Sequence, residues 1–369
     1  MRINDVQKCL ILGCFAAEGY YNPLQQNIWE VNMCEVSVVM PTFNKDKYLD
    51  LTLAAFSIQN YKDFELIIID DGSTDKTAEI VEKYKDICNI TYVFHSNQGR
   101  SYSRNVGLQI AKGRYIIFND DDRIPSSDFI SEHLATLKKD PKAVSIGSKK
   151  SILSYYSDNL TFRQFYLLNL LERDPGKLEK ILAHKDDTPL FTVNELVNDF
   201  KRVISEWFLY EARDNYKDII NSFSQSLNGF HFGWALATTG NMAFESAKSS
   251  TLFDENYVGW GLEDTDFAYQ LYKNGYTFRL SARAENFHQV HKRGNDEWNQ
   301  LRGNISRFCQ KYQTIETYLF AQVFQEVDGK SDFTFLDANE IFEKFLSINS
   351  DDSLYLNYIR LCKLWMGVK

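Results

Sequence analysis

The chain has 369 residues, of which 44% are hydrophobic and 25% are charged, and this is the composition of a globular protein rather than a disordered one. It carries 41 Lys and Arg against 50 Asp and Glu, a net charge of -9. A protein that binds nucleic acid usually carries a basic excess, so no nucleic-acid partner is expected. The length fits one large domain with extensions.

Six dispersed cysteines without any CxxC pair argue against a zinc ribbon and against a disulfide framework. Residues 1–34 have no strong period and are predicted to form an N-terminal extension. The longest apolar stretch there, Cys9 to Ala17, is shorter than the roughly 20 residues of a membrane-spanning helix. Ile11 to Cys14 only faintly resemble a lipoprotein box. A cytoplasmic protein without a membrane span is therefore expected.

Strand and helix signals alternate from residue 34 to about 140. Apolar, β-branched runs predict strands over 36–40, 66–69, 90–94 and 115–118, the first ended by Pro41. Helical spacing predicts helices over 48–59, 77–84 and 101–111. This alternation predicts an α/β fold with a doubly wound parallel sheet, whose ligands bind beyond the carboxyl ends of the strands.

The rest of the chain departs from this alternation. Residues 150–230 read as an inserted helical block, with helices expected over 160–184 and 193–223. Residues 231–300 are predicted to be loops and turns with one short helix, and residues 304–369 to be helical again. The predicted organisation is an extension over 1–34, a main domain over 35–310 and a helical C-terminal extension over 311–369.

Acidic residues follow two of the predicted strands. A tight turn with a helix cap accounts for Gly72 to Asp75, but it leaves unexplained the adjacent acids Asp70 and Asp71 at the end of a buried strand. Asp71 is a candidate acceptor for an N–H group of a nucleotide base.

Three consecutive carboxylates, Asp120, Asp121 and Asp122, follow the fourth predicted strand. Hard divalent cations prefer oxygen ligands and share them with diphosphates, so the triplet predicts a Mn²⁺ or Mg²⁺ site that holds a nucleotide diphosphate. The alternative is a solvated acidic loop.

Two arginines precede the triplet, at the start of a predicted helix. Arg100 or Arg104 could pair with phosphate through its planar guanidinium, or could form salt bridges within the protein. No GxxxxGK[ST] sequence is present, so a P-loop is not expected.

Four blocks in this order carry a family resemblance: VSVVMPTFN (36–44), ELIIIDDGSTDKT (65–77), NQGRSYSRNVGLQIAKGRYIIFNDDD (97–122) and GWGLEDTDFAYQL (259–271). Over roughly residues 34–310 the series resembles glycosyltransferase family 2 and its relatives with the GT-A fold, a Rossmann-like, mostly parallel sheet. The last block is similar to the Trp-Gly-x-Glu-Asp segment of β-1,4-galactosyltransferases and chondroitin-type polymerases. Those are inverting enzymes that use a UDP-sugar and a divalent cation.

The resemblance implies a donor pocket. Its members in this sequence are Pro41, Thr42, Asn44, Asp71, Arg104, Asp120, Asp121, Gly240, Asn241 and Trp260. Lys292 or Arg293 is implied to close over the diphosphate. The alternative for Trp260 is an ordinary core residue.

The resemblance also implies the reacting groups. Asp122 would ligate the cation directly, with His288 or His291 as a further ligand, the choice between them left open. Asp264 matches the catalytic base, which takes the proton from the acceptor hydroxyl, and Glu263 would hold the acceptor or a sugar hydroxyl. The alternative for these acids is that they complement a helix dipole, and this is the expected role of Asp266.

The predicted activity is that of a metal-dependent, inverting hexosyltransferase. It would move a hexose or N-acetylhexosamine from a UDP-sugar to a hydroxyl of a saccharide, a peptide or a small molecule, with Mn²⁺ or Mg²⁺ as cofactor. A retaining transferase or nucleotidyltransferase on the same fold, or a sugar-nucleotide- or glycan-binding protein without activity, are the alternatives. The sequence leaves the donor sugar, acceptor, linkage and oligomeric state open.

Overall fold

The structure is a computed structural model, which describes residues 34–156, 174–184, 187–211, 216–246, 250–291, 297–325, 333–347 and 353–365. The expected N-terminal extension, the first part of the helix expected over 160–184, and Lys292 and Arg293 lie outside the described residues. Within the described part of the chain, no helix has the length and apolar character needed to cross a bilayer.

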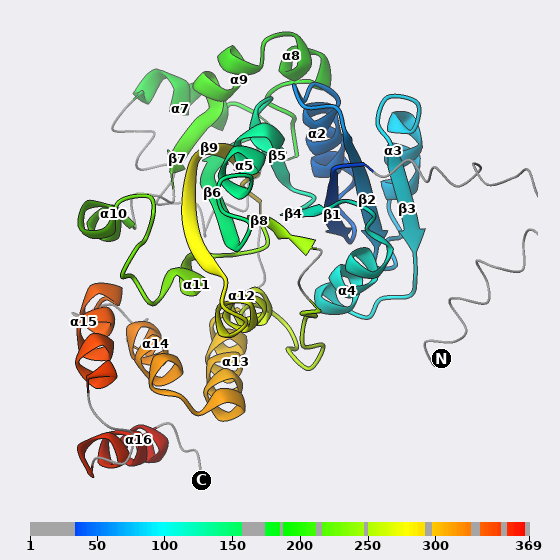
Figure 1. Ribbon diagram of the computed structural model, residues 1–369. Coiled ribbons are helices and arrows are strands. Elements are labelled where there is room, and N and C mark those ends of the chain that lie inside the picture. Colours follow the sequence, from blue (N-terminus) through cyan, green and yellow to red (C-terminus); the bar gives the residue numbers. More distant parts are fainter. Residues whose placement is uncertain are drawn as a thin grey trace, which may run out of the picture. The chain divides into compact units, whose positions relative to one another are not determined.

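The described residues form one nine-stranded sheet with the order β3-β2-β1-β4-β8-β6-β9-β5, and β7 pairs with β6 (Figure 1). The strands are β1 Val36–Thr42, β2 Phe64–Asp70, β3 Ile90–Phe94, β4 Tyr115–Asn119, β5 Arg123–Pro125, β6 Ala143–Ile152, β7 Phe208–Glu211, β8 Asn241–Glu245 and β9 Thr277–Gln289. Strands β3, β2, β1 and β4 are parallel, and so are β6 and β9. Strand β8 joins the two parallel groups by antiparallel pairing with β4 and β6.

Helices follow or connect these strands. They are α2 Asp46–Ser57, α3 Thr77–Tyr84, α4 Arg100–Ile110, α5 Phe129–Leu137, α7 Pro175–Leu182, α8 Val193–Asn198, α9 Phe200–Trp207, α10 Lys217–Phe223, α11 Gly233–Leu236, α12 Glu263–Lys273, α13 Glu297–Tyr312, α14 Ile315–Gln325, α15 Phe335–Leu346 and α16 Ser353–Trp365.

Apolar side chains on both faces of the sheet build two separate cores. Val36, Val38 and Met40 of β1 belong to one core, together with residues of α2, α3 and α5. Val39, between them, belongs to the other core, with residues of α11 to α15. Successive side chains of a strand point to opposite faces, which explains why the central strands are apolar throughout.

The α/β fold with a doubly wound sheet is confirmed. The four strands expected before residue 140 are β1 to β4, and the three expected helices are α2, α3 and α4. Each of these elements begins and ends within two residues of the expected position. One boundary is wrong: β1 does not end at Pro41 but continues to Thr42. Beyond Val39, β1 pairs only with β2, and a residue without an N–H group is tolerated in such a half-paired segment.

The expectation for residues 231–300 is wrong, because this region contributes β8 and the long, curved β9 to the sheet (Figure 1). The block over 150–230 is mainly helical where it is described, with α7 to α10, but it also contains β7. Strand β6, which pairs with both β8 and β9, was not predicted either. These strands form the half of the sheet that completes the site.

The helices after residue 296 share a core with the sheet domain. Trp234 of α11 is fully buried, and its ring centroid lies 4.8 Å from that of Tyr269, 5.7 Å from that of Phe308 and 5.1 Å from that of Phe320. Helix α13 continues past the expected boundary at residue 310. This aromatic packing holds α12, whose first turn carries Glu263 and Asp264.

Candidate active site

The acidic triplet and the end of β9 meet through strand pairing. The short strand β5, directly after Asp122, is antiparallel to β9, with Arg123 opposite His288. The pairing is extended by a backbone hydrogen bond of 2.8 Å from the Gln289 N–H to the Asp122 carbonyl. Residues more than 160 positions apart in the sequence thus lie side by side.

One carboxylate and two imidazoles form a candidate metal centre. The possible ligand atoms of Asp122, His288 and His291 all lie within 4.8 Å of one another. Nε2 of His291 is 2.8 Å from Oδ2 of Asp122, and Nε2 of His288 is 3.7 Å from the same oxygen. The structure therefore brings both candidate histidines to Asp122 rather than selecting one. Nζ of Lys45 lies 3.6 Å from that oxygen.

The neighbouring carboxylates differ in charge. Burial raises the pKa of Asp121 to about 7, and the charge of Asp122 acts in the same direction. Burial also acts to raise the pKa of Asp122, but His288, the hydrogen bond with His291 and the Lys45 ammonium together hold it well below its usual range. Asp122 is therefore fully ionised at neutral pH and ready to bind a cation, whereas Asp121 is only partly ionised.

A buried arginine links the triplet to α12. Arg104 is only 4% exposed; its guanidinium donates to Oδ1 of Asp120 at 3.2 Å and to Oε1 of Glu263 at 3.2 Å. Arg123 contacts the other carboxylate oxygen of Asp120 at 3.3 Å. Arg100 lies 3.6 Å from Glu263. Both helix α4 arginines thus form salt bridges within the protein, the alternative considered for them.

Asp264 has few hydrogen-bond partners. Among the described residues, only the backbone N–H and the hydroxyl of Thr265 donate to it, at 2.8 and 3.5 Å. Burial raises the pKa of Asp264 to about 6, with a further contribution from the charge of Glu263, while Arg104 and Lys149 act against the rise. A carboxylate with such a pKa can accept a proton near neutral pH.

Asp266, one turn of helix away from the helix start, has a different environment. It is fully buried and accepts hydrogen bonds from Lys311 at 2.9 Å, from Tyr257 at 3.1 Å and from Gln270 at 2.7 Å. These contacts join α12 to α13 and to the preceding loop. Asp266 therefore has a structural role through a buried ion pair with Lys311, whereas the sequence predicted only that it complements the helix dipole.

The adjacent acids at the end of β2 are both held by hydrogen bonds within the protein. Asp70 accepts from the Ser73 N–H at 2.7 Å and from the Tyr92 hydroxyl at 2.6 Å. Asp71 accepts from the Gln98 and Gly99 N–H groups at 2.7 and 2.9 Å, and so fixes the turn that begins α4. Its carboxylate lies at the carboxyl edge of the sheet, and each oxygen has a second lone pair that can accept a further bond.

The end of β1 is joined to the end of β2. The Thr42 carbonyl accepts from the Asp71 N–H at 2.9 Å, directly after Pro41. Asn44 has φ of 51° and accepts from the Thr74 N–H at 2.8 Å. The expected nucleotide-binding residues after β1 and β2 therefore form one connected edge, with Asn44 bracing the turn.

Of the expected pair Gly240 and Asn241, Gly240 lies at the site and Asn241 lies in the protein interior. A Cβ on Gly240 would lie 2.5 Å from Nε of Arg123 and 2.8 Å from Oδ2 of Asp120, so a larger residue here would have to displace these two side chains. The Asn241 side chain is fully buried instead and hydrogen bonds with His133 at 2.9 Å. The structure does not bring the Asn241 amide to the acidic cluster.

Trp260 lies in a loop whose backbone is tied to α13. The Trp260 N–H donates to Gln300 at 2.8 Å, and Asn304 donates to the Gly261 carbonyl at 2.9 Å. Gly259 and Gly261 have φ of 80° and 92°, which other residues rarely adopt. The Trp260 side chain is partly buried. Its burial therefore fits neither an exposed aromatic platform nor a fully buried core residue completely.

Three basic residues of the site were not predicted. Lys45 is the residue directly after Asn44, so the rule that chemistry follows strand ends could have identified it. Arg123 contacts Asp120, and Lys149 of β6 acts on the Asp264 and Asp120 charges. Lys149 had no sequence signal, because β6 itself was not recognised.

Comparison with known proteins identifies relatives of this chain. Residues 37–187 match the family model described as Glycosyl transferase family 2. An uncharacterized glycosyltransferase, YfnE, of Bacillus subtilis is 28% identical over 288 residues, which cover 77% of this chain and 72% of that protein. The chondroitin synthase of Pasteurella multocida is 30% identical over 262 residues, which cover 69% of this chain but only 24% of that longer protein. Residues 37–187 therefore form a glycosyltransferase family 2 domain, and the chain is a glycosyltransferase.

One solved structure that it resembles is Staphylococcus aureus TarS in complex with UDP-GlcNAc, at 18% identity and a TM-score of 0.48. The similarity covers 87% of this chain and 75% of that one. A similarity at that level carries no information about the substrate of this chain.

Proposed function

We propose that the chain is a metal-dependent, inverting glycosyltransferase that moves a hexose or N-acetylhexosamine from a UDP-sugar to an acceptor hydroxyl. The observation that carries the proposal is the pairing of a cation-binding cluster, Asp122 with His288 and His291, with a weakly engaged carboxylate, Asp264. The two are linked by the Arg104 bridge from Asp120 to Glu263. A protein that only bound the nucleotide sugar would have no use for such a base.

The donor set fits a transition-metal dication. Imidazole nitrogens suit first-row transition ions, whereas Mg²⁺ strongly prefers oxygen ligands, so the cluster favours Mn²⁺ over Mg²⁺. When bound, the metal would stabilise the charge on the departing diphosphate. Asp122, His288 and His291 are the residues that would hold it.

Asp264 performs the proton transfer in this proposal. The acceptor oxygen attacks the anomeric carbon while the bond from that carbon to the β-phosphate oxygen breaks, and the hydroxyl proton passes to the Asp264 carboxylate. UDP leaves on the opposite face of the sugar, and the anomeric configuration is inverted. Glu263, held by Arg104, would accept a hydrogen bond from a sugar or acceptor hydroxyl.

The choice of UDP depends on the resemblance of the four sequence blocks and on Asp71 at the sheet edge, which could accept from a base N–H. The relatives named chondroitin synthase and hyaluronan synthase support a sugar-polymer or oligosaccharide acceptor as one possibility among saccharide, peptide and small-molecule acceptors.

A panel of UDP-sugars tests this function by slow donor hydrolysis without acceptor. With Mn²⁺, we expect one or two sugars to release UDP and not pyrophosphate. Removal of the metal with EDTA should abolish the release, and Mn²⁺ should restore it better than Mg²⁺. Release of pyrophosphate would indicate a nucleotidyltransferase, and a retained anomeric configuration, read by NMR, would indicate a retaining enzyme.

The rate should also depend on pH through Asp264. The raised pKa, about 6, means that the carboxylate is protonated below pH 6 and cannot accept the acceptor proton there. We expect the rate at saturating Mn²⁺ to rise with pH through a midpoint at or slightly below 6, because a bound dication nearby lowers the pKa. A midpoint well above 7, or the same limb in the Asp264→Asn variant, would assign it to another group.

A further inference from the structure

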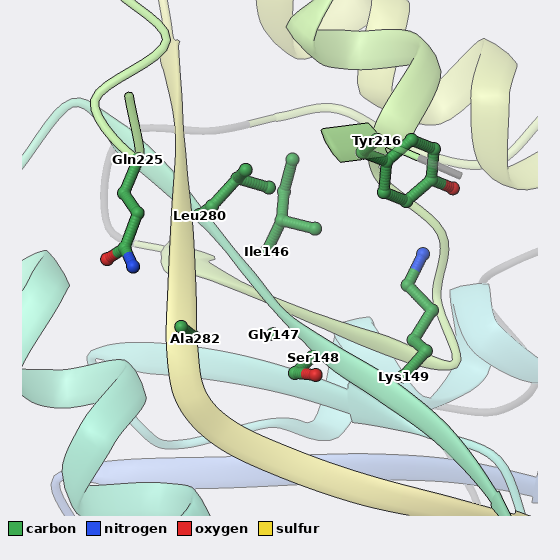
Figure 2. A pocket seen from close by; sticks show the side chains of 8 residues that line it. All are labelled: Ile146, Gly147, Ser148, Lys149, Tyr216, Gln225, Leu280 and Ala282. Atoms are coloured by element: carbon green, nitrogen blue, oxygen red, sulfur yellow. The ribbon is translucent and has the colours of Figure 1, made fainter. Parts of the chain in front are cut away.

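The place of Asp264 depends on how helix α12 begins, because few groups hold its carboxylate directly. Among the described residues, only Thr265 donates hydrogen bonds to it. Lys149, whose charge also acts on it, is bound elsewhere: its ammonium donates to the Leu236 carbonyl at 3.1 Å and to the Thr238 hydroxyl at 2.8 Å. The hollow beside Lys149 has a free volume of about 30 Å³, room for water but not for a sugar (Figure 2).

The segment that leads into α12 has an unusual backbone. Gly259 and Gly261 have φ of 80° and 92°. Leu262, directly before Glu263, has φ of 74°, and its side chain supplies no capping hydrogen bond to the helix. A leucine in this left-handed region is strained, because its Cβ lies too close to the following carbonyl oxygen. The first turn of α12, with Glu263 and Asp264, is therefore held in place by the contacts of this segment rather than by a cap.

Asn304 of α13 holds the segment through one amide group. Its Nδ2 lies 3.2 Å from the carbonyl oxygen of Val258, 3.3 Å from that of Trp260 and 2.9 Å from that of Gly261. Three carbonyls around one atom fix the orientation of the amide, because only its NH₂ end can donate to them. Asn304 is only 7% exposed, so these hydrogen bonds are shielded from water.

Gln300, one helical turn before Asn304 on α13, holds the same segment by a bond in the other direction. Its Oε1 accepts from the Trp260 N–H at 2.8 Å. A Cβ on Gly259 would lie 2.5 Å from the same oxygen, so the Gln300 side chain packs directly on this glycine. Helix α13 lies beyond residues 37–187, which match the family model, so the start of α12 depends on a helix outside that domain.

We propose that Asn304 is a positioning residue for the catalytic base. Through the backbone of residues 258–262, it sets the place and orientation of the Asp264 carboxylate against the reacting sugar carbon. This inference rests on the proposed function, because it deepens the role given there to Asp264. On the side of the sheet, the same helical turn is held by the bond from Arg104 to Glu263.

The Asn304→Asp variant tests this role with almost no change of shape, because a carboxylate cannot donate to the three carbonyls. The rate is measured as UDP release without acceptor at saturating Mn²⁺, with the best wild-type donor among UDP-glucose, UDP-galactose, UDP-GlcNAc and UDP-GalNAc. We expect a loss of about tenfold to 10²-fold, the cost of a misplaced catalytic group. Calorimetric binding of UDP and Mn²⁺ should stay close to wild type, because the hydrogen bonds of Asn304 reach the 258–261 backbone.

The matched control is Gln310→Glu. It makes the same change from amide to acid on the same helix, at an exposed position whose side chain donates to Ser306. Both the rate of UDP release and the binding of UDP and Mn²⁺ should be those of the wild-type protein.

A double variant distinguishes positioning from a general loss of stability. If Asn304 acts through Asp264, Asn304→Asp should cause little further loss of rate in the Asp264→Asn protein, which has no base to misplace. A merely structural role would multiply the two losses. If Asn304→Asp does not fold, Gln300→Met takes its place in the same comparison, since it removes the acceptor for the Trp260 N–H at a partly exposed position.

The outcomes separate this inference from the proposed function. With a slow Asp264→Asn protein, three results would overturn the inference alone: a wild-type rate in Asn304→Asp, losses that multiply in the double variant, or weakened binding of UDP and Mn²⁺ by Asn304→Asp. Absence of UDP release from all four donors by the wild-type protein, or wild-type turnover in Asp264→Asn, would overturn the proposed function and this inference with it.

Discussion

The Asp264→Asn variant is expected to lose about 10²-fold or more in turnover, the usual contribution of a general base. The amide has nearly the shape of the carboxylate but cannot accept the acceptor proton. Binding of UDP and Mn²⁺, measured by calorimetry, should stay close to that of the wild-type protein, because Asp264 is not among the candidate metal ligands. Turnover near the wild-type level would assign the base to another residue.

Asp266→Asn is the matched control, since it makes the same chemical change in the same helical turn. Asp266 is fully buried and paired with Lys311, so the variant should lower the melting temperature. Its turnover per folded molecule should remain near that of the wild-type protein. Comparable losses of turnover in both variants would point to disruption of α12 rather than to loss of a base.

Replacement of Asp122 by Ala should strongly weaken metal-dependent UDP binding. Loss of a residue that supports a ligand typically costs about 10–100-fold in metal affinity, and loss of the ligand itself should cost at least as much. Calorimetric titration of Mn²⁺ with UDP present measures the effect. Unchanged affinity would remove Asp122 from the metal site.

Three further variants sharpen that experiment. Asp128→Ala removes an exposed acid six residues along the chain, outside the cluster, and should leave Mn²⁺ binding unchanged. His288→Ala and His291→Ala, measured separately, show whether both imidazoles bind the ion. The geometry predicts that each loses affinity, since both nitrogens lie near Oδ2 of Asp122.

The first half of the sheet was predictable because its strands are buried on both faces. Ile67, Ile68 and Ile69 make an unbroken apolar run, and the helices between the strands have a clear period. Strand β9 was missed although Phe278, Leu280, Ala282 and Ala284 alternate with polar residues, a half-buried strand signal. Strand β6 mixes buried serines and partly buried lysines with its apolar residues, so neither an apolar run nor a clean alternation marks it.

The acids of the site were predictable, and its cations were less so. Asp122 stands in a conspicuous acidic triplet, which is costly unless something neutralises it, whereas Asp264 was identified only through the resemblance of its sequence block. Which histidine would join Asp122 depended on the pairing of β5 with β9, and tertiary pairing of that kind has no local signal. Lys149 reaches the site only because β6 passes beside the loop that carries Thr238.

A crystal structure of the protein with UDP and Mn²⁺, with the ion located by its anomalous scattering, tests the central claim most directly. The account predicts one manganese peak bound by Asp122 and at least one of His288 and His291, in contact with the diphosphate. It also predicts the Asp264 carboxylate on the side of the sugar position opposite that diphosphate. A manganese peak away from Asp122, or an Asp264 side chain turned away from the nucleotide, would contradict it.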